Sequence, residues 1–222
     1  MTGRRRTGFA RLPHTAGERV DADALLDLFA EGDGLLEGAS VRGVELSGAD
    51  AGEATFDGVS FCGCLFEYVD FGGCTFRDVR FEGCRFIRCT MDRAWLNRCD
   101  LVGCSAPGLS LVEARIAGAS FTECDLSYAN LSDSSIDRLE ARRTRLGESA
   151  WQRVRLKRTL LDACDLTRID VFRTSLSGID LSGCTFEAPV LSSDFHELRG
   201  ATVSVEQALA LAGLLGVRVS DD

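Results

Sequence analysis

Cysteine is the residue type with the greatest chemical potential in this chain, which contains ten cysteines among 222 residues. Thiolates are good ligands for zinc, so a regular series of cysteines is a candidate metal site. Six of them are separated by twenty or forty residues: Cys64, Cys84, Cys104, Cys124, Cys164 and Cys184. No Cys-x-x-Cys pair with histidine support accompanies them, although such pairs are typical of metal sites. Because buried cysteine also serves as a small apolar residue, we expect these thiols to be reduced, buried and free of metal.

Residues for acid–base or nucleophilic catalysis form no recognisable set in the sequence. The two histidines, His14 and His196, lie far apart along the chain, and both are interpreted as exposed polar residues. No glycine-rich phosphate loop stands out, because the Gly-x-x-Gly spacings follow a repeat of five residues. The sequence therefore predicts a binding protein with no enzyme activity, no cofactor and no metal.

This repeat of five residues organises most of the chain. Every fifth residue from Val41 to Leu191 is apolar, without a break in the count. Two residues earlier the chain has small or β-branched residues, including every cysteine except Cys62, and two residues later glycine is frequent. A period of five fits neither a helix nor a strand, whose periods are 3.6 and 2. Each unit must therefore be a short extended piece and a turn, with one large and one small residue facing inward.

The units CTFRD, CRFIR, CDLVG, CDLSY, ANLSD, CDLTR, IDLSG and CTFEA resemble the consensus A(D/N)LXX of the pentapeptide repeat family. The resemblance implies an all-β solenoid over residues 39–193: a right-handed quadrilateral β-helix with four units in each coil and short helical caps at both ends. In that fold the six regularly spaced cysteines form a column, with neighbouring coils roughly 4.8 Å apart. It also places Trp151 opposite Ala141, so that a large residue faces a small one.

Two segments of different composition precede the repeat. Residues 1–20 are rich in arginine and are predicted to form a flexible basic arm. Residues 21–38 contain a short apolar stretch that is typical of a helix, with Asp21 or Asp23 at its N-terminus and Gly32 or Gly34 at its end. A solenoid end exposes core residues and unpaired strand edges, so we expect this helix to cap it.

The C-terminal segment, residues 194–222, is predicted to form a helix that starts with a Ser204–Gln207 capping box and is followed by a closing strand. Its stretch LRGATVSVEQALALAGLLGV resembles the ending of the Qnr and MfpA type of quinolone-resistance pentapeptide proteins. The resemblance implies a homodimer joined through this segment. The residues assigned to the dimer interface are Ala208, Leu209, Leu211, Ala212, Leu214, Leu215, Val217 and Val219.

The same resemblance implies a partner. Proteins of this type form slender acidic dimers that resemble duplex DNA and bind DNA gyrase and topoisomerase IV, and they protect the enzyme from gyrase poisons or modulate its response to them. The net charge of −9 at pH 7 is compatible with such mimicry and argues against direct nucleic-acid binding. Qnr proteins carry loops that interrupt the repeat, whereas this repeat is unbroken from Val41 to Leu191, which is closer to the loop-less MfpA type.

Charge is distributed unevenly along the repeat. The first half is acidic, whereas residues 138–173 form a band with more arginine and lysine than acidic residues. The candidate partner-binding residues are Asp50, Asp57, Glu67, Asp70, Asp78 and Glu82. Two alternatives stay open: these acids are merely solvated outer positions, and the rod binds another cytosolic partner with no topoisomerase role. With no apolar run near 18 residues and no secretory signal, the chain is predicted to be cytoplasmic without membrane contact.

Overall fold

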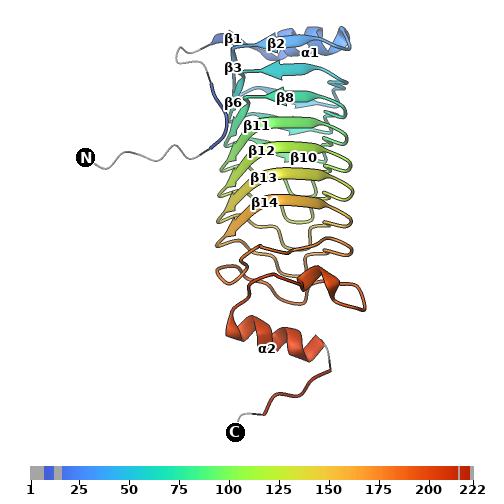
Figure 1. Ribbon diagram of the computed structural model, residues 1–222. Helices are drawn as coiled ribbons and strands as arrows, with labels where there is room; N and C mark the ends of the chain where they lie inside the picture. Colours follow the sequence, from blue (N-terminus) through green and yellow to red (C-terminus); the bar gives the residue numbers. More distant parts are fainter. Residues whose placement is uncertain (1–7, 13–16, 215, 221–222) are drawn as a thin grey trace, which may run out of the picture.

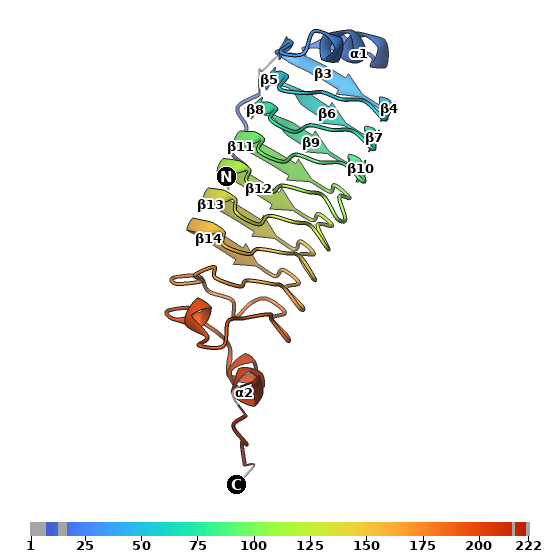
Figure 2. The ribbon, with the colours of Figure 1, turned by 90° about the vertical axis from the view of Figure 1, so that its right-hand side faces the viewer.

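The computed structural model describes residues 8–12, 17–214 and 216–220. The chain winds into a right-handed, four-sided β-helix whose coils stack along one axis, with one helix at each end (Figure 1). Seen from the side, the strands of successive coils lie above one another in regular columns (Figure 2). The predicted all-β solenoid is thereby confirmed.

The regular elements are short. The helices are α1 (Ala22–Ala30), α2 (Val205–Leu214) and the 3-10 helix η1 (His196–Leu198). The strands are β1 (Glu18–Val20), β2 (Leu35–Glu37), β3 (Ala39–Arg42), β4 (Glu45–Ser47), β5 (Thr55–Asp57), β6 (Ser60–Cys62), β7 (Leu65–Glu67), β8 (Thr75–Arg77), β9 (Arg80–Glu82), β10 (Arg85–Ile87), β11 (Trp95–Val102), β12 (Arg115–Thr122), β13 (Ser135–Arg142) and β14 (Arg155–Asp162).

Within the repeat, each strand pairs in parallel with the strand one coil away. Phe56 pairs with Phe76 in the next coil, and the same shift of four units joins Leu96 to Ile116 in the longer strands. One sheet runs β1-β3-β6-β9-β11-β12-β13-β14, with β2, β5 and β8 joined to it through β11, and a second sheet contains β4, β7 and β10. This register confirms four units per coil and brings equivalent residues of successive coils into columns.

The interior is a dry stack of the residues that recur every five positions. In the first coils it consists of phenylalanine rings, with Phe56 stacked on Phe76 at 5.1 Å and Phe61 on Phe81 at 4.9 Å between centroids. Leucine takes over further along, and Trp151 and Ala141 are both fully buried. Along the repeat's large apolar positions, Leu156 and Leu191 differ from the rest because they are only partly buried.

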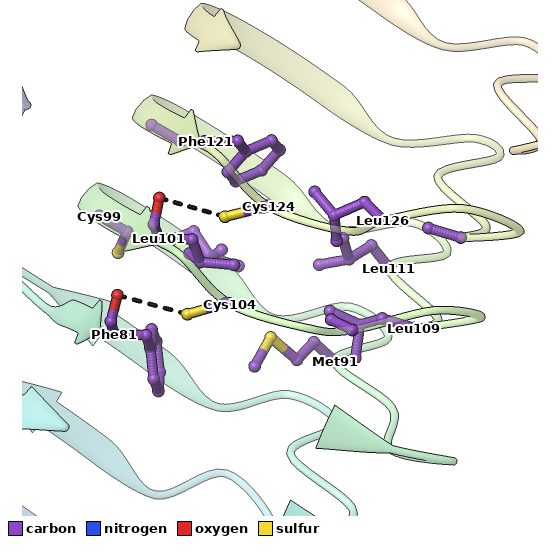
Figure 3. Close-up of a cluster of buried hydrophobic side chains, with 14 of the residues drawn as sticks. Phe81, Met91, Cys99, Leu101, Cys104, Leu109, Leu111, Phe121, Cys124 and Leu126 are labelled. Atoms are coloured by element: carbon purple, nitrogen blue, oxygen red, sulfur yellow. Dashed lines mark hydrogen bonds between the residues drawn. The ribbon is translucent and has the colours of Figure 1, made fainter. Parts of the chain in front are cut away.

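Most of the buried cysteine thiols donate hydrogen bonds to backbone carbonyl groups of the preceding coil. Cys104 donates to the carbonyl oxygen of Phe81, and Cys124 donates to that of Leu101, each at 3.4 Å (Figure 3). Every cysteine is free, all are buried except the half-buried Cys62, and burial raises the pKa of Cys99 to about 12. The thiolate, which is the reactive form, is therefore scarce for Cys99 at neutral pH. At Cys164 the hydrogen bond with Cys184 instead lowers the pKa to about 7, so burial and not the pKa is what protects this thiol.

We expect an alkylating reagent such as iodoacetamide to modify Cys62 alone in the native protein at pH 7.5, and all ten cysteines after denaturation. Mass spectrometry of the native and unfolded protein measures the number of labelled thiols. Cys62→Ser should then show no native labelling. Rapid native modification of several thiols would contradict the buried column.

The N-terminal end of the solenoid is closed as predicted. α1 begins at Asp21, whose side chain accepts a hydrogen bond from the amide of Ala24 at 3.1 Å. The helix buries Leu25 and Phe29 against the first coil, where the Phe29 ring packs on Phe56. β1 extends the sheet by one strand, which pairs in parallel with β3.

The C-terminal end differs from the expectation of a helical cap. η1 and the residues after it close the last coil, with Leu198, Ala201 and Val203 packed against the core. The Ser204–Gln207 capping box forms as predicted. α2 has no fully buried residue: it packs the half-buried Leu211 against the core and otherwise projects past the end of the rod (Figure 1). The predicted closing strand is absent from the described residues, since Val217 and Val219 lie in no strand. No helix in the described residues has the length and apolarity needed to cross a membrane.

Candidate interaction surface

The six candidate acids stand on different faces of the rod. Asp50 and Asp70 lie in one column, joined by a backbone bridge, and each accepts a hydrogen bond from the amide two residues on, that of Gly52 or Gly72. Glu67 is the last residue of β7, and Asp70 lies after the bend that follows this strand. None of these three carboxylates forms an ion pair within the described part of the chain.

The other three acids are engaged by neighbouring groups. Asp57 pairs with Arg77 at 2.9 Å and Glu82 with Arg80 at 3.1 Å. Asp78 is buried rather than exposed, and it forms an ion pair with Arg98. Burial is the largest single influence and would raise the pKa of Asp78, but the hydrogen bonds from Arg98 and from the amide of Arg11, together with the charges of the two arginines, outweigh it and lower the pKa. In the described residues Asp50, Glu67 and Asp70 are therefore the candidate acids without an ion pair, and Asp78 is inaccessible.

Ion pairs between successive coils neutralise most of the basic band at residues 138–173. Arg143 pairs with Glu123, Arg145 with Asp125 and Arg153 with Asp133, each at 2.6 Å. Arg142, Arg158 and Arg168 are paired in the same way with acids about one coil away. The sequence contained a signal for these ion pairs, because residues of opposite charge stand about twenty positions, or one coil, apart. Exposed pairs of this kind add little to stability, but together they remove most of the positive field of the basic band.

The described part of the N-terminal arm lies against the rod, although the sequence predicts a flexible arm. The backbone amides of Phe9 and Ala10 donate to the two carboxylate oxygens of Asp100, at 2.7 and 3.2 Å. The amide of Arg11 donates to Asp78 at 2.9 Å, and the hydroxyl of Ser120 completes the coordination of Asp100 at 2.6 Å. Asp100 is 3% exposed as a result. Three arginines of the arm, at positions 4–6, lie outside the described residues, and so does His14.

Two glycines make this docking specific. A Cβ atom on Gly8 would lie 2.2 Å from a carboxylate oxygen of Asp100, so only glycine fits there. The Phe9 ring rests on Gly118, 3.4 Å from where a Cβ would be. Arg98 and Arg138 hold the equivalent positions of the neighbouring coils with similar positive φ, so the backbone of Gly118 does not itself require glycine. The absence of a side chain at position 118 instead provides the space for Phe9.

Gly118→Arg should release the arm while leaving the rod folded. A left-handed non-glycine residue costs about 1 kcal/mol, which the rod already accommodates at Arg98. Amide exchange at Phe9 and Ala10 should accelerate at least tenfold, and trypsin should cleave after Arg11 sooner. Gly103→Arg is the matched control, because its φ is +59 and the space beside it is open. Equal arm protection in both variants would contradict the proposed fit.

The surface of α2 is the largest apolar area at the C-terminal end. Leu209 is 48% exposed and Leu214 47%, and Ala208 is also exposed, whereas Leu211 and Ala212 are half-buried. Val217 and Val219 continue this exposed apolar surface. Leu215, the remaining predicted interface residue, lies outside the described residues. Gln207 fixes the start of α2 by donating to the carbonyl oxygens of Leu181 and Cys184.

One cluster near the rod end has the composition of a metal site. Asp194, His196 and Glu197 could bring one ligand atom each to within 4.8 Å of the others. The Glu197 carboxylate is fully buried and accepts hydrogen bonds from the amide of Arg173 and the hydroxyl of Ser192, both at 2.8 Å. These contacts give Glu197 a structural role in closing the last coil. His196 is part of this cluster and not an isolated surface residue.

Comparison with known proteins agrees with this geometry. Two solved structures of trypsin-treated QnrB1, described as a plasmid-mediated fluoroquinolone resistance protein, share the fold at 19% identity. One has a TM-score of 0.52 and covers 84% of this chain and 98% of its own; the other has a TM-score of 0.51 and covers 82% and 100%. No curated protein sequence matches the chain. At this identity the likeness establishes the fold.

Family descriptions match the repeat directly. "Pentapeptide repeats (8 copies)" matches residues 35–67, and "Pentapeptide repeat region" matches residues 74–151. Together these two stretches make up half of the chain, and both lie within the four-sided helix. The chain belongs to the pentapeptide repeat family.

Proposed function

We propose that this protein is a DNA-mimicking binding protein of the Qnr/MfpA type. It acts in the cytoplasm, without chemistry of its own, by binding a type II topoisomerase, DNA gyrase or topoisomerase IV, and it modulates the response of that enzyme to gyrase poisons. The observation that carries the proposal is the distribution of charge: Asp50, Glu67 and Asp70 are unpaired, whereas most arginines of the basic band are neutralised. The rod therefore presents a negative first half and a nearly neutral second half.

The mimicry rests on shape and on a few rows of charge. Duplex DNA carries about one negative charge per 1.7 Å, whereas a column of acids on this rod has one per coil, roughly 4.8 Å apart. The rod cannot reproduce DNA charge for charge. A slender rod with acidic rows is instead suited to a positively charged groove that holds a duplex, where each row replaces part of a phosphate backbone.

Dimerisation through α2 would double the length of the rod. Leu209 and Leu214 on α2 and Val217 and Val219 beyond it are about half exposed in one chain, which supports a two-fold interface at this segment. The proposed interface comprises Ala208, Leu209, Leu211, Ala212, Leu214, Leu215, Val217 and Val219. Two rods joined end to end would be roughly 80 Å long, from the coil spacing and the rise of the joining helices.

Leu209→Glu combined with Leu214→Glu should convert a dimer into a monomer, because both side chains are about half exposed in one chain and a charge at a packed interface is unfavourable. Sedimentation velocity at micromolar concentration measures the mass. The circular dichroism spectrum and the melting temperature should stay near wild type, since neither residue contacts the core. A monomeric wild-type chain would remove the dimer from the proposal.

The proposal as a whole is tested with purified DNA gyrase. We expect the protein to inhibit supercoiling, or to change the amount of cleaved DNA that accumulates with a quinolone, at micromolar concentration. Direct binding is measured in parallel by biolayer interferometry. If the protein neither binds gyrase or topoisomerase IV nor alters their activity, the alternative applies: an interaction rod for another cytosolic protein.

A further inference from the structure

The wall of the β-helix is open on one side below β14. In the coils above, the amide of Asp78 donates to Asn97 and that of Arg143 donates to Asp162, so each coil is bonded to the next. The corresponding groups of β14 are the amides of Arg158 and Ala163. No backbone hydrogen bond joins β14 to residues 175–183, although the structure describes all residues of both segments.

The coil after β14 pairs with the chain below it instead. Residues 157–158 lie inside β14, whereas the equivalent residues 177–178 form a turn in which Gly178 has a φ of +78°. From this turn Gly178 donates to the carbonyl oxygen of Gly200 at 2.8 Å, and Leu181 donates to that of Thr202 at 2.8 Å. The coil is therefore held by the closing segment and leaves the lower edge of β14 unpaired.

A cleft of about 410 Å³ occupies this opening. Thr159, Leu160 and Leu161 of β14 line one side, and Gly178, Asp180 and Ser182 line the other. Leu160 is 42% exposed although it lies on a structured strand, and the Thr159 hydroxyl is buried without a hydrogen-bond partner in the described residues. The cleft thus combines an unpaired strand edge, an apolar side chain and an unsatisfied hydroxyl.

We propose that this opening is a β-augmentation site, in which an extended segment of a partner protein pairs with the lower edge of β14. An exposed strand edge offers a row of main-chain donors and acceptors that an extended peptide can satisfy, as in other strand-addition complexes. The site is separate from the acidic rows and from α2.

The charges beside the edge specify the occupant. Arg155 and Lys157 are exposed and form no ion pair within the described residues, so outward-facing acidic residues opposite them give favourable cross-strand pairs. Further along the strand, Leu160 and Leu161 favour β-branched apolar residues, and the unpaired Asp180 favours a basic residue. The occupant is therefore a segment that runs parallel to β14, with acidic residues first, β-branched residues next and a basic residue last.

The probe is the fluorescein-labelled peptide EVEGTVIK, titrated with the full chain and followed by fluorescence anisotropy. We expect it to bind at least tenfold more tightly than the charge-swapped peptide KVKGTVIE. It should also bind at least tenfold more tightly than the same peptide with N-methylated valine and isoleucine, which cannot form strand hydrogen bonds. Equal binding of the N-methylated peptide would overturn strand pairing.

Arg155→Glu with Lys157→Glu should reverse this preference, so that KVKGTVIE binds tenfold more tightly than EVEGTVIK. Arg85→Glu with Arg93→Glu removes two exposed arginines elsewhere and should leave the preference unchanged. No reversal would overturn the assignment of the site. Self-association of the chain that is lost in the Arg155 and Lys157 variant, without peptide binding, would replace the partner segment by a second copy.

Amide exchange tests the open edge in the protein alone. The amides of Arg158 and Ala163 should exchange at least tenfold faster than that of Arg143, which is hydrogen-bonded at 2.9 Å in the coil above. Saturating EVEGTVIK should slow both. Protection of Arg158 and Ala163 equal to that of Arg143 in the free protein would overturn the proposal at its first step.

Discussion

Leu101→Asp should abolish the folded rod. Leu101 is 2% exposed and pairs in register with Phe81 on one side and Phe121 on the other, so its side chain lies in the middle of the core (Figure 3). A buried carboxylate with no partner costs roughly 3–5 kcal/mol, and loss of the packed leucine adds about 2–5 kcal/mol. Because whole domains are stable by only about 5–15 kcal/mol, we expect little folded protein at 37 °C.

Circular dichroism and thermal unfolding measure this loss. Leu26→Asp is the matched control, because Leu26 lies on the exposed side of α1 and is already 44% accessible to solvent. It should change the free energy of unfolding by less than about 1 kcal/mol. A Leu101→Asp protein that melts with the wild type would mean that the inward register is wrong.

Neutralising three acids should remove most of the affinity for gyrase. Asp50→Asn, Glu67→Gln and Asp70→Asn together delete three of the unpaired negative charges of the first coils. The asparagines can still accept the hydrogen bonds from Gly52 and Gly72, so the turns survive. With about 0.2–1 kcal/mol for each of the three screened charge contacts, the concentration for half-inhibition should rise by between about threefold and about a hundredfold.

The control variant removes three unpaired acids from the second half: Glu113→Gln, Asp180→Asn and Glu187→Gln. It has the same net charge as the first variant and should inhibit gyrase as the wild type does. Inhibition by the wild type should also weaken as salt rises, because the screening length falls to about 10 Å at 0.1 M. If both triple variants lose activity equally, total charge matters and the position of the acidic rows does not.

The repeat of five residues was enough to predict the fold and the residues that form its core. Apolar residues every five positions determine the register, so the buried column of Cys104 and Cys124 and the stack of Phe56 on Phe76 could be anticipated. Local chemistry also worked: Asp21 begins α1, and Gln207 closes a capping box with Ser204. These predictions depend only on residues close in sequence or on strict periodicity.

The features that the sequence did not predict depend on contacts between segments that are not related by the repeat of five residues. The apolar period continues through Leu176 and Leu181, so it gives no sign that this coil separates from β14. The burial of Asp78 depends on the backbone of Arg11, which is 67 residues away and outside the repeat. For the same reason the acidic rows could be named from composition, but not which of them are accessible.

The docked arm ties residues 8–11 to a part of the chain that is made much later. Phe9 and Ala10 bind Asp100, 91 and 90 residues further on, and the Phe9 ring rests on Gly118. During synthesis the N-terminal residues are available first, yet they have nothing to bind until the coils that contain Asp100 and Gly118 have been translated and wound. The arm can therefore dock only after the coils in the middle of the rod have folded. A nascent chain arrested before residue 100 would leave the amides of Phe9, Ala10 and Arg11 without the carboxylates that they bind in the finished rod.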